Sequence, residues 1–144
     1  MAQETTDSVQ GVTVGSVATF EKTVTQEDIA RFAEVSGDTN PLHSDAEYAA
    51  RTRFKAPIAH GMLAAGVISA ALGTRLAPES VVIYLSQNLR FRAPVMAGDT
   101  LTATVTATAV DTESSLVTVD TVVTNQDGTD VIRGDATVMI DALA

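Results

Sequence analysis

The chain has 144 residues, of which 45% are hydrophobic, and it carries a formal net charge of -9. This length suits a single domain that can bury a sizeable core without disulfides or metal ions. The excess of 18 acidic over 9 basic residues argues against binding of nucleic acid or anionic membranes, unless basic side chains are concentrated locally. The chain has no cysteine, which excludes disulfides, thiolate metal sites and a cysteine nucleophile.

Residues 1–10 are polar and aperiodic, which is typical of a flexible tail, and they lack the features of a secretory signal. We therefore expect a cytoplasmic protein. No apolar stretch reaches the ~20 residues that a membrane-spanning helix needs. Aspartate is more frequent than glutamate, and the only lysines are Lys22 and Lys55. Such a surface favours a halophilic origin, because salt screens its charge repulsion; an acidic protein from a mesophile is the alternative.

The first part of the domain is expected to contain short strands and then a helix. Apolar and polar residues roughly alternate over 12–24, which favours one or two short strands. Thr25 is placed to cap the helix that follows, with Asp28 as its capping-box partner three residues on. Gly37 is placed to end this helix in a left-handed conformation.

The middle of the chain contains an irregular loop and an apolar helix. Pro41 disfavours the helical region for Asn40, so residues 38–43 are expected to form a loop. Residues 61–72 have the sequence GMLAAGVISAAL and are apolar on every side, which predicts a buried core helix. Such a helix is about 18 Å long, which is too short to cross a membrane.

The last part of the chain has the pattern of antiparallel strands. Its segments are rich in β-branched residues or alternate between apolar and polar positions, and Asn125–Gly128 has the composition of a hairpin turn. The predicted strands are 81–92, 100–108, 115–124 and 131–140. A short strand, then helices, then antiparallel strands predicts an α+β domain over 11–144, in which the sheet wraps around the long buried central helix.

The segment Gly37–His43, with the sequence GDTNPLH, is the strongest candidate for chemistry. Asp38 and His43 lie five positions apart on a loop fixed by Pro41, so both side chains can turn toward one point. A histidine titrates near neutral pH and a carboxylate accepts hydrogen bonds, which suits acid–base chemistry on one water molecule. Spacing alone leaves an alternative open, in which Asp38 caps a turn and His43 packs passively.

The residues that lead into the core helix are a second candidate. A helix N-terminus offers unpaired N–H groups and partial positive charge, and Gly61 allows close approach of a ligand, as an oxyanion site for a thioester carbonyl requires. A plain tight turn before a core helix explains Gly61 equally well. His60 either takes part in the chemistry or orients the loop. Ser69, about two turns into the helix, is either a ligand contact or a core hydroxyl bonded to a backbone carbonyl.

Other site types find little support. Two histidines and one aspartate could suggest a metal site, but their spacing matches no HExxH-type motif, so no metal is expected. No phosphate-binding glycine loop, dinucleotide fingerprint or GxSxG motif is present. Two groups of basic residues could hold the phosphates of coenzyme A, or could equally pair with nearby acids. They are Arg90 and Arg92 on one face of a strand, and Arg51, Arg53 and Lys55.

Two long stretches resemble one known family. SGDTNPLHSDAEYAARTRFKAPIAHGMLAAGVISAALG, over 36–73, looks like the hydratase motif of the MaoC-like (R)-specific enoyl-CoA hydratases, and IYLSQNLRFRAPVMAGDTL, over 83–101, looks like the strand pair that follows it. The resemblance runs from about Gly11 through nearly the whole chain. It is closest to short single-domain members that supply polyhydroxyalkanoate (PHA) synthesis. It implies a hotdog fold and a homodimer with active sites at the subunit interface.

The resemblance also implies roles for individual residues. The family's catalytic aspartate and histidine fall on Asp38 and His43, its carbonyl-binding glycine amide on Gly61, its active-site serine on Ser69 and its loop-supporting asparagine on Asn40. The implied reaction is reversible addition of water to trans-2-enoyl-CoA, giving (R)-3-hydroxyacyl-CoA, in PHA or fatty-acid metabolism. Coenzyme A enters as part of the substrate and no cofactor is implied. A non-catalytic acyl-binding hotdog subunit and an acyl-CoA thioesterase are the alternatives.

Overall fold

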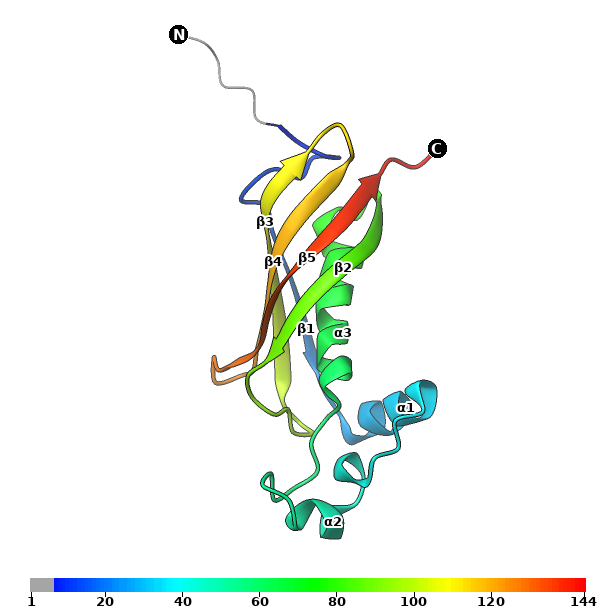
Figure 1. Cartoon of the computed structure of the whole chain (residues 1–144), viewed down its shortest axis with the longest axis vertical. Helices are drawn as coiled ribbons and strands as arrows, with labels where there is room; N and C mark the ends of the chain where they lie inside the picture. The colour runs from blue at the N-terminus through cyan, green and yellow to red at the C-terminus, as the bar shows by residue number, and fades with distance from the viewer. Residues whose placement is uncertain (1–6) are drawn as a thin grey trace.

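Five antiparallel strands curl around one long helix in the computed structural model, which describes residues 7–144 (Figure 1). The strands are β1 (Val17–Thr23), β2 (Val81–Phe91), β3 (Thr100–Asp111), β4 (Leu116–Thr124) and β5 (Asp130–Asp141). Their order in the sheet is β1-β3-β4-β5-β2, and every neighbouring pair is antiparallel. This arrangement confirms the predicted α+β hotdog fold.

The helices divide between the inner face of the sheet and one end of the molecule. α3 (Gly61–Ala71) lies along the face of the sheet, while α1 (Gln26–Ser36) and α2 (Ala46–Ala50) lie at the end where α3 begins (Figure 1). A short 3₁₀-helix covers Pro41–His43, and a π-helical turn, Leu72–Leu76, follows α3. In the described part of the chain, no helix is long and apolar enough to span a membrane.

The core lies between α3 and the inner face of the sheet. In β3 the predicted alternation is confirmed, since Leu101, Ala103, Val105 and Ala107 are buried while the intervening threonines are partly exposed. In β4 the buried positions are the valines of the inner face and Thr121. The outer face of the sheet carries the more polar side chains, as is usual for an antiparallel sheet with one solvated face.

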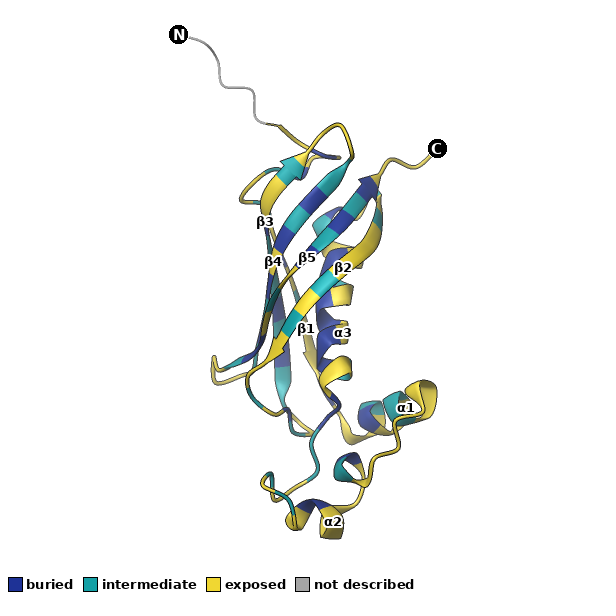
Figure 2. Ribbon diagram, in the orientation of Figure 1, coloured by how far each residue is buried: buried dark blue, intermediate teal, exposed yellow. Residues whose placement is uncertain are grey.

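The core helix α3 is buried on one side only. Its sheet-facing residues are buried, but Met62, Gly66 and Ser69 are exposed and recur at intervals of four and three, which places them on one stripe; Gly61, at the start of the helix, is exposed as well (Figure 2). Burial on every side, the expectation from the sequence, is therefore wrong for this stripe in the single chain. Small and apolar residues occupy both sides of α3, so hydropathy could not distinguish them.

One edge of the sheet is also apolar and uncovered. Among the described residues β2 pairs only with β5, so its other edge has no neighbouring strand. Several large apolar side chains of β2 are exposed, and Leu85 has 51% of its surface accessible. The others are Val81, Ile83, Tyr84 and Phe91.

Ordered structure begins before Gly11. Val9 forms an isolated bridge with Val12, and both side chains are buried in the core. The flexible tail expected over 1–10 falls largely on residues 1–6, which lie outside the described residues.

The start and the end of α1 are set as the sequence predicts. The side chain of Thr25 accepts a hydrogen bond from the Asp28 amide at 3.0 Å, and the Asp28 carboxylate accepts one from the Thr25 amide at 2.9 Å. Gly37 ends the helix with φ of 82° in the left-handed region. The hydrogen bond from the Thr25 amide lowers the pKa of Asp28 below its ordinary value of 3.8, and Lys22, 3.2 Å away, adds to the effect. This helix end fixes where the loop that follows α1 begins.

Replacing Asp28 with alanine should lower the free energy of unfolding at pH 7 by about 1 kcal/mol, the usual size of a capping interaction. Because folding lowers the pKa of Asp28, its contribution is present above pH 3.8 and is lost as the pH falls through the folded-state value. Urea unfolding at several pH values measures this difference. Glu34→Ala, an exposed change on the same helix, is the control. Equal stability of Asp28→Ala and wild type at pH 7 would contradict the assignment.

Candidate active site

The loop after α1 is held by its own polar side chains. Asp38 Oδ1 accepts a hydrogen bond from the Asn40 amide at 3.2 Å, and Asn40 Oδ1 accepts one from the Leu42 amide at 3.1 Å. The Asp38 amide in turn donates to Ser36 Oγ at 3.1 Å. Asn40 thus caps the 3₁₀-helix that starts at Pro41 and carries His43. Asp and Asn commonly bond to the backbone two residues on, which explains why this sequence forms a defined loop.

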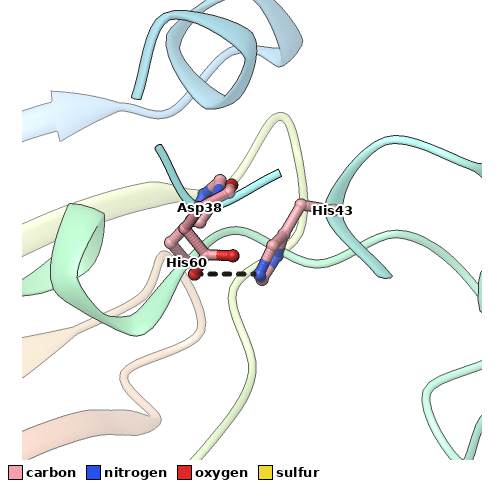
Figure 3. A group of neighbouring side chains, drawn as sticks. All are labelled: Asp38, His43 and His60. Atoms are coloured by element: carbon pink, nitrogen blue, oxygen red, sulfur yellow. Dashed lines mark hydrogen bonds and ion pairs between the residues drawn. The ribbon is translucent and has the colours of Figure 1, made fainter. Parts of the chain in front are cut away.

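His43 is buried and its orientation is fixed by the backbone. Its Nδ1 lies 2.7 Å from the carbonyl oxygen of Ile58. A carbonyl can only accept, so Nδ1 carries the proton and Nε2 of the neutral ring is an acceptor. Figure 3 shows the Asp38 carboxylate directed at this ring, with Oδ2 3.9 Å from Nε2. The structure therefore brings Asp38 and His43 together, as the sequence predicts.

His60 joins this pair from the start of α3. It is buried, its Nε2 lies 2.9 Å from the carbonyl oxygen of Asp38, and its ring stacks on His43 with 3.7 Å between centroids. The ring also contacts Phe32 at a tilted angle, with 4.8 Å between centroids. The sequence indicated that His60 could take part in the chemistry or orient a loop, but not which residue it contacts, since a contact between residues 22 positions apart has no local signal.

Asp38, His43 and His60 could in principle hold a metal ion, because their ligand atoms lie within 4.8 Å of one another. The ring geometry fits a metal poorly. One nitrogen of each histidine already bonds to a backbone carbonyl. The remaining lone pairs, on Nε2 of His43 and Nδ1 of His60, lie in the planes of two stacked rings, 3.7 Å apart between centroids and 25° from parallel. A point about 2 Å from both nitrogens therefore does not lie in both ring planes, as metal ligation by both lone pairs requires.

Gly61 lines the same cavity as Asp38, His43 and His60. The carbonyl of His60 accepts from the amides of Leu63 and Ala64, whereas within residues 7–144 the Gly61 amide has no acceptor. The ring of Phe91 packs against Gly61 so closely that a Cβ there would lie 2.8 Å from Cε1 of the ring. Only glycine fits this position without displacing Phe91, a contact that no pattern in the sequence indicated.

Two cavities meet at Gly61. The first, which we name the aspartate cavity, has a volume of about 490 Å³ and is lined by Asp38 and His43. The second, the arginine cavity, has a volume of about 510 Å³ and is lined by Arg53 and Arg92. Both are lined by Gly61, so a ligand bound in the arginine cavity can reach the aspartate cavity past the start of α3.

A third cavity lies further along α3. This serine cavity, of about 400 Å³, is lined by Ser69 from α3 and by Tyr84 and Gln87 from β2, and it shares Met62 with the aspartate cavity. The Tyr84 hydroxyl donates to Gln87 Oε1, and burial raises the pKa of Tyr84. Ser69 is exposed and lies about 12 Å along the helix from Gly61, so it belongs to this cavity rather than to the acid–base pair.

The remaining basic residues are not part of these cavities. Arg51 and Lys55 are exposed on the segment after α2 and do not line the arginine cavity. Arg90 is exposed on β2, opposite Arg133 of β5. The structure thus joins one residue from each predicted basic group, Arg53 and Arg92, and leaves the other three apart.

Fold and site together define a hotdog domain with a candidate acid–base pair and, at the start of its core helix, an amide that has no acceptor among the described residues. The chain belongs to the MaoC-like family: the family described as "MaoC like domain" matches residues 10–129. The predicted family is thereby confirmed.

The relatives cover nearly the full length of the chain. It is 52% identical over 128 residues to an (R)-specific enoyl-CoA hydratase of Rhodospirillum rubrum, covering 89% of this chain and 88% of that protein. It is 41% identical over 133 residues to an (R)-specific enoyl-CoA hydratase of Aeromonas caviae, covering 92% and 98%.

Two solved structures with a similar fold are also described as (R)-hydratases. The unliganded R-hydratase PhaJ1 of Pseudomonas aeruginosa matches with a TM-score of 0.83 and 41% identity, covering 92% of this chain and 84% of that one. The (R)-hydratase of A. caviae involved in PHA biosynthesis matches with a TM-score of 0.85 and 40% identity, covering 90% and 98%.

Because the stacked rings do not converge on one point, Asp38, His43 and His60 should form no specific zinc site. Calorimetric titration of the EDTA-treated protein with Zn²⁺ should give the same weak binding for wild type and for His43→Gln. A one-to-one site with Kd of about 1 μM or below that His43→Gln abolishes would contradict this prediction.

Proposed function

We propose that the protein is an (R)-specific enoyl-CoA hydratase, a hydro-lyase that adds water reversibly to trans-2-enoyl-CoA. The observation that carries this proposal is the Asp38–His43 pair, whose facing atoms lie 3.9 Å apart beside the free amide of Gly61. The similarity to hydratases of R. rubrum and A. caviae supports it. The product, (R)-3-hydroxyacyl-CoA, would serve PHA synthesis or fatty-acid metabolism.

The spacing of the pair suits one shared water molecule. Asp38 Oδ2 and Nε2 of neutral His43 are both acceptors, so they cannot bond to each other, and 3.9 Å is longer than a direct hydrogen bond. A water molecule between them can donate one proton to each. Its oxygen lone pairs then remain free to attack C3 of the enoyl group.

In the proposed reaction the water oxygen forms a bond to C3 as the C2–C3 π bond breaks. One water proton passes to the pair, and the pair delivers one proton to C2, so that OH and H are added in total. Both transfers involve groups on one side of the substrate, which gives syn addition. The reverse sequence dehydrates the 3-hydroxyacyl thioester, and proton transfer by side chains needs no metal or redox cofactor.

The Gly61 amide would bind the thioester carbonyl. Attack at C3 moves negative charge onto the carbonyl oxygen, as in an enolate. A backbone N–H at a helix N-terminus, with its partial positive charge, is suited to stabilise that charge. Because Gly61 lines both the aspartate and the arginine cavity, a carbonyl bound there lies between them.

The three cavities suit three parts of the substrate. Arg53 and Arg92 would contact the phosphates of coenzyme A in the arginine cavity, and the reacting carbons would lie in the aspartate cavity. The acyl chain would extend past Met62 into the serine cavity, where Ser69 would orient it. Asn40 would act indirectly, by capping the 3₁₀-helix that carries His43.

Asp38→Asn and His43→Gln should each lower kcat for crotonyl-CoA by at least about 100-fold, because each removes one proton-transfer partner. Hydration is followed by loss of enoyl absorbance, with chiral analysis of the product. Asp127→Asn, the same change in the exposed hairpin turn, should leave the rate unaltered. Near-normal rates in the first two variants, an (S) product, or release of free CoA thiol would refute the proposal.

We also propose that the protein is a homodimer formed through β2 and the exposed stripe of α3. A long apolar edge strand is prone to pair with another strand, and a two-fold axis would pair two copies of β2. The exposed side chains Leu85 and Tyr84 and the stripe residues Met62 and Ser69 also line the serine cavity. A second copy would therefore complete the walls of that cavity.

Wild type should sediment at about twice the 15.0 kDa of the chain. Leu85→Glu should shift it toward the monomer, because it places a charge on the proposed interface. Val35→Glu is the matched control, since Val35 is an apolar residue of α1 with 87% of its surface exposed. A monomeric wild type, or equal dissociation of the two variants, would contradict the interface.

A further inference from the structure

His60 contacts both members of the acid–base pair. Its Nε2 donates to the main-chain carbonyl of Asp38 at 2.9 Å, and its ring stacks on the ring of His43 at 3.7 Å and 25°. The same residue caps α3, since its own carbonyl accepts from the amides of Leu63 and Ala64. One side chain thus links the Asp38 loop, the His43 ring and the start of the core helix.

We propose that His60 is a positioning residue that sets the gap between the Asp38 carboxylate and the His43 imidazole. The inference rests on the proposed hydratase function, in which that gap holds one water molecule. A shift of about 1 Å in the Asp38 main chain would take the water out of reach of one partner, and misplacements of this size can cost about 100-fold in rate.

The contacts of Asp38 explain why its loop needs this support. Its other hydrogen bonds, from its amide to Ser36 Oγ and to its Oδ1 from the Asn40 amide, are exposed and reach only the last residue of α1 and the loop itself. The bond from His60 ties the loop to a buried side chain 22 positions away. The ring of that side chain contacts two other rings, stacking on His43 and packing at a tilted angle against Phe32.

The hydrogen bonding of the His60 ring shows which of its two nitrogens holds the Asp38 loop. Because Nε2 donates to a carbonyl, the neutral ring has no proton on Nδ1. Nδ1 is buried and has no hydrogen-bond partner within the described residues, although such an acceptor costs about 1–3 kcal/mol. The contribution of His60 to the site is therefore the hydrogen bond that Nε2 donates, and Nδ1 makes none.

Three substitutions separate the donor from the ring. Glutamine places an amide N–H near the position of Nε2, asparagine places one near Nδ1, and phenylalanine keeps the stacked ring but has no donor. A positioning role predicts that His60→Phe lowers kcat for crotonyl-CoA by about 10- to 100-fold, with KM changed by less than about threefold. His60→Gln should recover at least about tenfold of that loss, and His60→Asn should not.

The rank order decides between positioning and packing. If His60 only fills space, His60→Phe keeps nearly full activity and His60→Gln is the poorer enzyme, which would overturn the proposal. Melting temperatures confirm that the variants are folded. A wild type that does not hydrate crotonyl-CoA refutes the proposed function instead, so the two failures are distinguishable.

A measurement on the wild-type protein keeps the proposal testable if the variants do not fold. Nitrogen-15 NMR of histidine-labelled protein should show His60 as the Nε2–H tautomer, with a slowly exchanging proton. An Nδ1–H tautomer, or rapid exchange of the Nε2 proton, would show that the bond to Asp38 does not form in solution and would overturn the inference.

Discussion

The Asp38 carboxylate and Nε2 of His43 face each other across 3.9 Å, and with the His43 ring neutral both atoms are acceptors, so neither can bond to the other. The arrangement persists because His43 donates from Nδ1 to the carbonyl of Ile58, which fixes the ring and exposes its lone pair to the gap. A water molecule in the gap can donate one hydrogen bond to each acceptor and still has oxygen lone pairs available for attack. The chemistry that we propose follows from this single constraint.

The fold places the other parts of the site around that gap. The capped helix α1 fixes where the Asp38 loop begins, and α3 begins at Gly61, whose amide has no acceptor in residues 7–144. Phe91, from the sheet that wraps α3, packs against Gly61. The arginine cavity shares Gly61 with the aspartate cavity and the serine cavity shares Met62 with it, so a substrate has two cavities into which it can extend. The exposed side of α3 and the free edge of β2 border the serine cavity, so assembly of two chains and binding of the acyl chain are coupled in this account.

Local patterns in the sequence predicted what depends on local physics. The capping box at Thr25, the alternation in β3 and the hotdog fold are confirmed, and the family resemblance extended the prediction to individual site residues. What the sequence could not predict depends on contacts between distant segments. The bond from His60 to Asp38 and the meeting of Arg53 with Arg92 have no periodic signal. The exposed stripe of α3 was missed because its residues are as small or apolar as the buried ones.

The central claim is that one water molecule, held between Asp38 and His43, supplies the hydroxyl group while the pair protonates C2 from the same side. Hydration of crotonyl-CoA in D₂O tests this most directly, with the configuration of the product at C2 and C3 determined by NMR. The account predicts a single diastereomer, with deuterium and hydroxyl added to the same face and the (R) configuration at C3. Addition to opposite faces, or a mixture at C2, would contradict it.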